Sequence, residues 1–545
     1  MTFSSSNAAR VPRRRRTWLG LLGLTTALSG VAVAGGASVA ATHQSSNREK
    51  VLVWGQSTDP QSLWNATDFN ATDGAPIMSL INQGLLSFDA KNQLVPALAS
   101  SWKEVSPTKY VYTIRKGVKF SDGHPLTAAD VVYSIDVQRD PSVASDENNF
   151  FTDIKSVKGS GDTVTVELST PDALWAYIPA HEAGYVYEKS SLEGHLKDYG
   201  TPGVLPIGTG PYKVQSYVAN SEITLVRNPY YWGPKPYYDK VVFDIIPDPQ
   251  TLFLAMRAGK IDGTFDVPTG NLPTWKSASS IHITTFPADG FYGLTLDETE
   301  FPFSNIHVRK AIAYAMPRGG IEAAIFGGTG RVAKTLDDPR TLQGLLPNSE
   351  IKKLFAQIPS YSYDIAKAKK ELAKSPVPKG FSTTLNVAAP CSRCVAVSQA
   401  LKASLAQIGI NVTLNMMAGP PRFQYILAHG PNLGIQLIGN VADVPDPIEL
   451  PWLYYASDQA VKGGNNSSNF KNPQVDSIIQ QGLYSTDFPK VALDAIKVET
   501  MAARDVAMVP LVYLSTVAAT YGRLHLKNPG AFFMDYVWIN QLSNS

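Results

Sequence analysis

The chain has 545 residues, of which 44% are apolar and 17% are charged. A chain of this length buries a large core and exceeds the usual size of one domain, so we expect more than one globular part. Without residues 1–40, 43 basic residues remain against 46 acidic ones. A nearly neutral chain lacks the basic surface that nucleic-acid binding requires, and we predict no nucleic-acid partner.

The first forty residues have the order of an export signal. Arginines at 13–16 precede a mildly apolar stretch at 18–33, and small residues follow up to Ala40. We predict a signal peptide over 1–40 and an extracytoplasmic protein, exported by the Sec route or, because Arg15-Arg16 precedes Trp-Leu, by the twin-arginine route. An uncleaved membrane anchor is the alternative, although the apolar stretch hardly reaches the ~18 residues that a span needs.

Residues 94–136, LVPALASSWKEVSPTKYVYTIRKGVKFSDGHPLTAADVVYSID, predict a strand, a turn and a helix. Apolar and polar residues alternate over 110–114, which is typical of a half-buried strand. The helix is expected to begin after Thr127, because Asp130 stands three residues later as in a capping box. His124 in the SDG turn is expected to be structural.

Two later blocks also predict their elements. In residues 206–263, PIGTGPYKVQSYVANSEITLVRNPYYWGPKPYYDKVVFDIIPDPQTLFLAMRAGKIDG, we expect strands at 212–217 and 241–245 and a helix at 249–258. In residues 302–316, PFSNIHVRKAIAYAM, apolar residues recur at helical spacing, and Ser304 or Asn305 can cap the helix.

Cys391 and Cys394 are the only two cysteines of the chain. They stand between a predicted strand at 385–388 and a helix that ends at Gly409, before an alternating strand at 410–416, an order typical of a parallel α/β unit. In an oxidising compartment we predict an inert disulfide. Free thiols and a redox-active pair are the alternatives, since a C-x-x-C at a helix start can be reactive. Two cysteines do not complete a four-ligand zinc site, and we predict no metal.

The order of these blocks, with the block 505–528 near the carboxy terminus, resembles the family 5 extracytoplasmic solute-binding proteins of ABC importers. The resemblance extends from about residue 48 to the end of the chain. It implies a receptor rather than an enzyme, without a cofactor. It also implies an α/β, two-lobed periplasmic-binding-protein fold of type II, with an extra inserted subdomain and with a cleft and a hinge between the lobes.

The same resemblance implies the domain boundaries. Lobe I is expected to be discontinuous, at 48–87, 206–292 and 516–545. An inserted subdomain is expected within it at 88–205, and lobe II is expected at 293–515. The two chain crossings would form the hinge, which suits closure around a ligand.

One segment, IQLIGNVADVPDPIELPWLYYAS at 435–457, predicts a binding residue. It resembles the family pattern W-x-A-D-Y-x-x-P, whose aspartate holds the α-ammonium group of a bound peptide. That match places the charged anchor at Asp443, with Asn440 at the tryptophan position and Val444 at the tyrosine position. The alternative is that Asp443 only caps a turn before Pro445.

Four aromatic residues are further candidates for the ligand site. The resemblance places Tyr292 and Tyr513 at the two crossings and Phe69 and Phe150 in segments of lobe I that approach the ligand. Each of them could equally be a core residue, because aromatic residues make up 10% of the chain.

We therefore expect a monomeric receptor that captures a small peptide or peptide-like solute and delivers it to an ABC permease and ATPase complex. A metal chelate, haem, an oligosaccharide or a signalling peptide are alternative ligands for the same fold. A secreted hydrolase or thiol-disulfide enzyme is a remote alternative. No catalytic residue is predicted, because the sequence has no H-E-x-x-H and no G-x-S-x-G motif.

Overall fold

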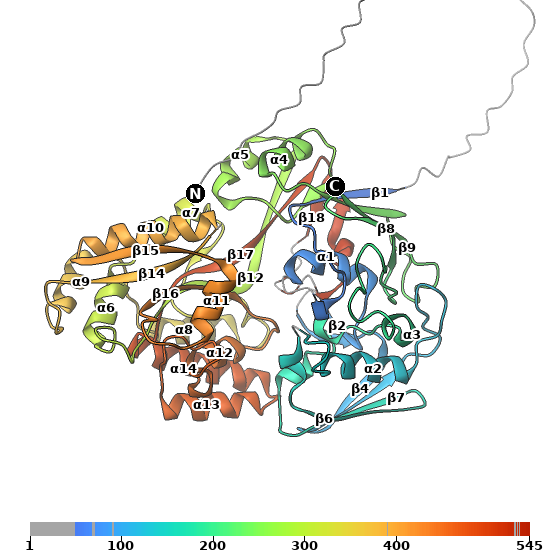
Figure 1. Ribbon diagram of the computed structural model, residues 1–545, viewed down its shortest axis with the longest axis horizontal. Coiled ribbons are helices and arrows are strands. Elements are labelled where there is room, and N and C mark those ends of the chain that lie inside the picture. Colours follow the sequence, from blue (N-terminus) through green and yellow to red (C-terminus); the bar gives the residue numbers. More distant parts are fainter. Residues whose placement is uncertain are drawn as a thin grey trace, which may run out of the picture. The chain divides into compact units, whose positions relative to one another are not determined.

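A computed structural model describes residues 50–67, 71–89, 92–145, 147–389, 391–527, 530, 532 and 535–544. The predicted signal peptide and Phe69 lie outside the described residues. Figure 1 shows two lobes, which we define by their residues. Lobe I comprises the described residues of 50–280 and 522–544, and lobe II comprises those of 297–507.

Two long antiparallel strands belong to both lobes. They are β12 (Ile281–Leu296) and β17 (Met508–Tyr521), which run from one lobe into the other (Figure 1). Their pairing register shifts between Pro287 and Phe291, where a bulge interrupts the ladder. The boundaries expected from the sequence, 292/293 and 515/516, fall inside these continuous strands and stay predictions.

One sheet of eleven strands passes through both lobes in the order β15-β14-β16-β12-β17-β11-β1-β10-β9-β8, with β13 also paired to β17. The elements of lobe I around this sheet are β1 (Val51–Gln56), α1 (Ala71–Ile81), β8 (Tyr212–Val218), β9 (Glu222–Arg227), β10 (Lys240–Ile245), α4 (Pro249–Arg257), β11 (Gly263–Thr264) and α5 (Leu272–Ser277). The strands predicted at 212–217 and 241–245 and the helix at 249–258 are confirmed within one residue at each end.

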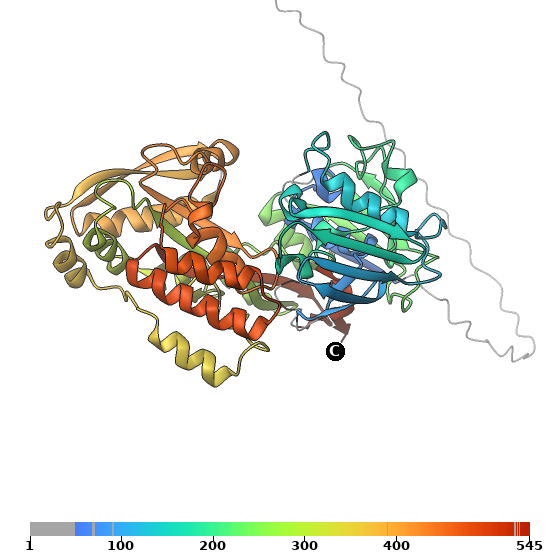
Figure 2. The same ribbon diagram turned by 90° about the horizontal axis from the view of Figure 1, so that it is seen from below.

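Lobe I also carries a separate antiparallel sheet in the order β4-β5-β7-β6, which Figure 2 shows face on at the right. This region contains β2 (Leu86–Phe88), β3 (Leu94–Pro96), β4 (Ala99–Ser106), β5 (Lys109–Ile114), α2 (Ala128–Gln138), β6 (Ile154–Ser160), β7 (Thr163–Leu168) and α3 (Lys189–Leu192). The predicted start of α2 is confirmed: Thr127 N donates to Asp130 Oδ2 at 2.9 Å. Two short strands of lobe I, β18 (Leu524–Leu526) and β19 (Leu542–Asn544), pair with each other in a separate antiparallel sheet.

Lobe II places helices around β14, β15 and β16. Its elements are α6 (Ile306–Tyr314), α7 (Arg318–Ile325), β13 (Arg331–Val332), α8 (Asn348–Gln357), α9 (Ile365–Leu372), β14 (Phe381–Ala389), α10 (Ser392–Ala406), β15 (Ile410–Ala418), α11 (Gly419–Leu427), β16 (Ile435–Val441), α12 (Glu449–Tyr455), α13 (Pro473–Leu483) and α14 (Phe488–Asp505). Strands β14 and β15 are parallel, as predicted, and α10 connects them. Asn305 caps α6 through a bond from His307 N to its side chain.

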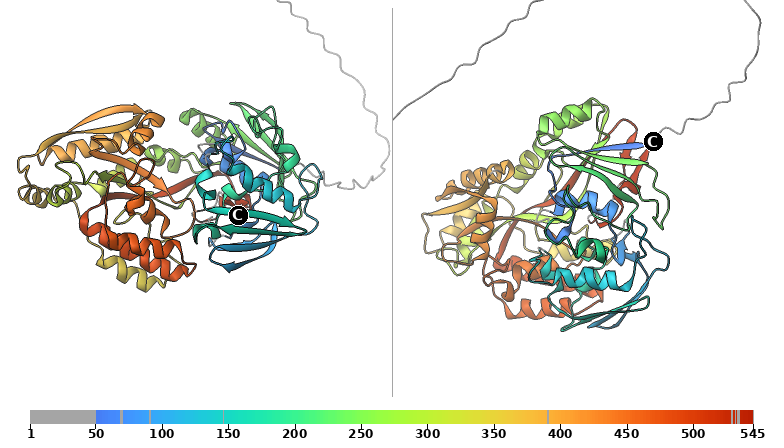
Figure 3. Two further views of the ribbon diagram at one scale, coloured as in Figure 1. Left: turned by 60° about the horizontal axis from the view of Figure 1, so that its bottom comes forward. Right: turned by 45° about the vertical axis from the view of Figure 1, so that its right-hand side comes forward.

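Two large hydrophobic clusters make up most of the core. In one of them, Leu385 and Leu401 of lobe II are fully buried together with Leu294 of β12 and Val509 of β17. The other cluster covers lobe I and also includes residues of α12, α13 and α14, so the two lobes share part of this core. Both views of Figure 3 show β12 and β17 running from one lobe to the other. Residues at the inner ends of β12, β16 and β17 are therefore placed between the lobes.

Candidate functional site between the lobes

The loop that follows β16 presents Asp443. At its start, Ala442 N donates to the carbonyl of Asp289 at 2.8 Å, which ties the loop to β12. Glu449, at the first position of α12 and 2% exposed, accepts bonds from the backbone N–H groups of Asp443 and Val444, each at 3.0 Å. The buried Glu449 carboxylate thus shapes the loop, while the Asp443 side chain remains exposed.

Glu449 and Asp443 interact electrostatically. Burial raises the pKa of Glu449 well above its ordinary value, and the charge of Asp443 raises it further. The pKa of Asp443 is also raised by desolvation, because protein surrounds its solvent-exposed carboxylate on most sides, whereas a hydrogen bond from Glu449 opposes this rise. The hydrogen bond between the two side chains thus raises the pKa of Glu449 and lowers the pKa of Asp443, so the proton in this bond belongs to Glu449.

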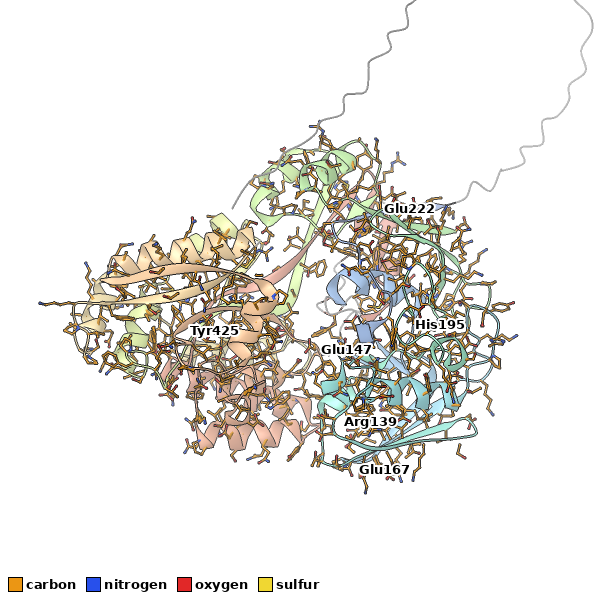
Figure 4. All side chains as sticks on the ribbon, viewed as in Figure 1. Arg139, Glu147, Glu167, His195, Glu222 and Tyr425 are labelled. Atoms are coloured by element: carbon orange, nitrogen blue, oxygen red, sulfur yellow. A yellow bond between two sulfur atoms is a disulfide. The ribbon has the colours of Figure 1, made fainter. Side chains whose placement is uncertain are left out.

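Further carboxylates of lobe I lie close to this loop. Asp535 Oδ1 accepts a bond from Glu182 N at 3.0 Å, and burial raises its pKa well above the ordinary value. The charges of Glu147 and Asp443 raise that pKa further. Figure 4 labels Glu147 at the side of lobe I nearest to lobe II. Carboxylates from three segments of the chain therefore meet at the loop 442–449, which we call the acidic end.

The core of the acidic end has no lysine or arginine partner in the part of the chain that the structure describes. Within the described part of the chain, Asp443, Glu449 and Asp535 form no salt bridge. Carboxylates brought together without a countercharge raise one another's pKa values and attract any cation that enters. The acidic end is therefore a place where a positively charged group would be stabilised.

Tyr292 lies farther along β12, opposite Gly439 of β16. Its half-buried ring packs against Phe326 in a T-shaped contact at 5.6 Å between ring centroids. Its hydroxyl lies 3.1 Å from the Sγ atom of Cys394. A Cβ atom at Gly439 would lie 2.4 Å from the tyrosine ring, so only glycine lets the ring lie across β16.

Two arginines that belong to no recognised motif approach Tyr292. Burial raises the pKa of Tyr292, and the charges of Arg393 and Arg422 act in the opposite direction. Arg422 Nε donates to the carbonyl of Asn386 at 2.9 Å, and its Nη2 donates to the carbonyl of Leu437. Within the described residues neither arginine pairs with a carboxylate. We call this place around Tyr292 the basic end.

Cys391 and Cys394 form a disulfide with an S–S distance of 2.01 Å. Cys391 is the N-cap of α10, and its Sγ accepts a bond from Cys394 N at 3.1 Å. Arg393 stands between the two cysteines, and its guanidinium lies 5.3 Å from the centroid of the Phe326 ring. The C-x-x-C pair is therefore part of the basic end.

The other candidate residues have different environments. Asn440 pairs with Phe291 in the sheet, is half-buried and hydrogen-bonds to Tyr454 through its side chain. Phe150 is half-buried, and its ring lies 5.4 Å from that of His181. Tyr513 is only 3% exposed, and its hydroxyl accepts bonds from two backbone N–H groups, those of Lys334 and Thr335. Tyr513 is thus buried, and its hydroxyl holds the backbone of the segment that contains Lys334 and Thr335.

A cavity of about 380 Å³ lies beside the acidic end. Both lobes contribute to its lining, which includes Trp102, Tyr110, Tyr177, Asp289, Thr341, Pro445, Phe488 and Phe532. Asp289 is 6% exposed, and its Oδ1 atom has no hydrogen-bond partner among the described residues. Five aromatic side chains line the cavity beside aliphatic and polar residues, and Asp289 with its unsatisfied oxygen is part of the lining.

One group could hold a metal ion among the described residues, namely Asp122, His124 and Glu188. The Nδ1 atom of His124 lies 2.7 Å from a carboxylate oxygen of each acid. The hydrogen bond with Glu188 raises the pKa of His124, followed by the charge of Asp122. An Nδ1–H group that donates to the carboxylates accounts for this geometry without a metal ion.

Comparisons with known proteins place the chain in a family. Residues 93–462, more than half of the chain, match the family described as Bacterial extracellular solute-binding proteins, family 5 Middle. Glutathione-binding protein GsiB of Escherichia coli is 27% identical over 484 residues, which cover 86% of this chain and 89% of that protein. The protein of the same name from Pectobacterium atrosepticum is 26% identical over 77% of this chain and 80% of its own length.

Solved structures share the fold. The periplasmic binding protein DppA from Helicobacter pylori, in complex with peptide STSA, has a TM-score of 0.75 at 23% identity and covers 91% of this chain and 98% of its own. The oligopeptide-binding protein AppA from Bacillus subtilis, in complex with a nonapeptide, has a TM-score of 0.70 at 23% identity, with 91% and 99% covered.

No described helix combines the length and the apolar character that crossing a membrane would require. The predicted two-lobed α/β fold is confirmed by the strand order and by these structural relatives. The family match, together with a site built between two lobes from β12, β16 and the loop after β16, leads to one conclusion. The chain belongs to the bacterial extracellular solute-binding proteins, family 5.

Proposed function

We propose that the protein captures a short peptide with a free ammonium and a free carboxylate group in the cleft between its lobes. The observation that carries this proposal is that, among the described residues, Asp443, Glu449 and Asp535 at one end and Arg393 and Arg422 at the other form no salt bridge. Relatives that are named for glutathione binding or solved with bound peptides support the same ligand class.

The acidic end would bind the ammonium group of the peptide. Asp443 would accept its hydrogen bonds, with the carboxyl groups of Glu449 and Asp535 beside it. A charge-assisted hydrogen bond is about twice as strong as a neutral one. A desolvated carboxylate without a partner is costly, so an ammonium group that pairs with it gains affinity and selectivity.

The basic end would bind the carboxylate group, through Arg393 and Arg422. Arg422 donates to the carbonyl of Leu437, and Asp443 follows Leu437 in the chain. At ~3.3 Å per residue, the extended chain between Leu437 and Asp443 spans at most about 20 Å. An extended peptide advances ~3.5 Å per residue, so a ligand of no more than about five residues would contact both ends. The two ends thus favour short peptides over long ones.

The space between the ends would accept varied side chains. Tyr292 and Asn440 lie along the two paired strands there, and Phe150 faces the same region from lobe I in the proposed arrangement. The cavity beside Pro445 offers aromatic walls to one apolar or aromatic side chain. Binding at both lobes would stabilise the closed form, since only a ligand that contacts both favours closure.

We further propose that the protein binds its solute without converting it. It would be exported, lose residues 1–40, act as a monomer and hand the peptide to an ABC permease with its ATPase. The hinge would lie in β12 and β17, near the boundaries 292/293 and 515/516. The disulfide would serve structure rather than turnover.

The test is calorimetry with trialanine and glutathione on the wild type and on Asp443→Asn. The substitution keeps the size of the side chain but removes its charge, so we expect the affinity to fall at least about tenfold. Glu350→Gln is the matched control, because Glu350 is an exposed acid of α8 that lies outside the site. An unchanged Kd for Asp443→Asn would remove Asp443 from the site, and recovery of chemically altered peptide would contradict a binding role.

A further inference from the structure

The disulfide Cys391–Cys394 encloses one of the two arginines of the basic end. It closes a ring of four residues, in which Ser392 and Arg393 are both exposed. The ring lies at the first turn of α10, directly after β14. The covalent bond therefore fixes the short segment from which the Arg393 side chain projects.

Contacts on both sides link this ring to Tyr292 and Phe326. The Sγ atom of Cys394 lies 3.1 Å from the hydroxyl of Tyr292 on β12. The guanidinium of Arg393 lies 5.3 Å from the ring centroid of Phe326, and Phe326 packs on Tyr292 at 5.6 Å. One continuous set of contacts thus joins the disulfide, Arg393 and Tyr292.

Apart from the disulfide, few interactions hold the first turn of α10 in place. Its N-cap is Cys391, whose sulfur is a weak acceptor compared with the oxygen of Ser, Thr, Asp or Asn. The turn contains no acidic residue that would interact with the helix dipole. Arginine has a flexible side chain, and fixing its origin lowers the entropy lost when it binds a carboxylate.

We propose that the disulfide Cys391–Cys394 positions Arg393 in the cleft wall and thereby sets the affinity for ligands that carry a free carboxylate. Arg393 is the specificity-determining residue, and the disulfide is its positioning element. This inference rests on the proposed function, because it concerns the basic end of the same site. Loss of the disulfide weakens recognition of the carboxylate and leaves recognition of the ammonium group intact.

The decisive experiment compares trialanine with its carboxy-terminal amide on the wild type and on the double variant Cys391→Ser/Cys394→Ser. The expected result is a loss of about tenfold in affinity for the free acid and no change for the amide, because a hydrogen-bonded charge pair is lost only with the former. An equal loss for both peptides means that the disulfide supports the fold in general and overturns the proposal. Equal affinities of variant and wild type for the free acid overturn it as well.

A mutant cycle isolates Arg393. Arg393→Ala alone is expected to lower the affinity for trialanine about tenfold, and removing the disulfide in addition is expected to have no further effect. Additive losses contradict the proposal, because the disulfide would then act through other residues. Arg257→Ala is the matched control, since this arginine lies at the end of α4 in lobe I.

Reduction offers a reversible version of the same test. A dithiol such as dithiothreitol supplies two electrons and two protons, becomes a cyclic disulfide and leaves Cys391 and Cys394 as two thiols. Affinity for trialanine is expected to fall as in the double variant and to return on reoxidation. Affinity that does not change on full reduction contradicts the proposal.

Hydrogen exchange without any ligand separates this inference from the proposed function. Amides of the first turn of α10 are expected to exchange faster in the double variant, and those of α6 are expected to be unchanged. Unchanged exchange in α10 overturns the positioning role even if the wild type binds peptides. Should the wild type bind neither peptide, the proposed function fails, and the exchange rates alone decide whether the disulfide fixes this segment.

Discussion

The acidic end and the basic end are supported by different physical means. At the acidic end, carboxyl groups lie close together, and the pKa values of Asp443, Glu449 and Asp535 are all raised, mainly by desolvation. At the basic end, backbone carbonyls and an aromatic ring hold two guanidinium groups in place. The acidic end should therefore respond to pH, whereas the basic end should respond to its covalent and backbone supports.

Arg422→Ala is expected to have the largest effect among the changes that test this contrast. It removes a carboxylate partner, so the affinity for trialanine should fall about tenfold while the affinity for the amide is preserved. Calorimetry with both peptides measures the ratio. Arg422 also donates to the carbonyls of Asn386 and Leu437, so the Tm of the variant is recorded as a control for local damage. Equal losses for acid and amide would place Arg422 in the scaffold and not at the ligand.

Much of the fold could be predicted because its signals are local. The capping box at Thr127, the cap at Asn305 and the strand–helix–strand order around α10 depend on residues close in sequence, and the structure confirms them. Burial of Tyr513 could not be predicted, because side chains on both faces of β17 are covered and alternation does not identify the cleft face.

The candidate site was only partly readable from the sequence. Asp443 stands in a segment with a family pattern, but Glu449 six residues later looks like an ordinary acid at a helix start. Its role depends on a loop that folds back onto its carboxylate. Arg393 and Arg422 come from different helices and meet only at Tyr292, a partner on a distant strand. Long-range pairings of this kind leave no periodic signal.

The affinity for peptides is expected to increase with pH between about pH 5 and about pH 7. Desolvation raises the pKa of Asp443, so its carboxylate protonates at a higher pH than an ordinary aspartate, and a neutral carboxyl group binds an ammonium weakly. The peptide ammonium, with a pKa near ~8, stays charged throughout. Calorimetry at several pH values measures the slope. N-acetyl-trialanine, which lacks the ammonium group, should show a flat profile, and a similar slope for both peptides would locate the titrating group elsewhere.

The free energy of unfolding should decrease as the pH rises, in contrast to the affinity, and its change should be the smaller effect. Burial raises the folded-state pKa of Asp446 and of Glu499 to about 7, above their ordinary values of 3.8 and 4.5. A raised carboxylate pKa contributes stability that is fully present below the unfolded-state value and is lost as the pH rises to the folded-state value. His181, whose pKa burial lowers to about 4, acts in the opposite sense between about pH 4 and 6.5 and cancels only part of the loss.

The Tm measured without peptide should therefore be higher at about pH 5 than at about pH 8, by ~5 °C. Asp446→Asn removes one titrating group from a site where Oδ2 has no partner, so the difference should shrink in this variant. Asp494→Asn, on the surface of α14 beside Lys490, should leave it unchanged. If the wild type instead became more stable as the pH rose from about 5 to about 8, the buried carboxylates would be ionised in the folded protein. The acidic end would then hold its charges as the basic end does, and the contrast between the two ends would disappear.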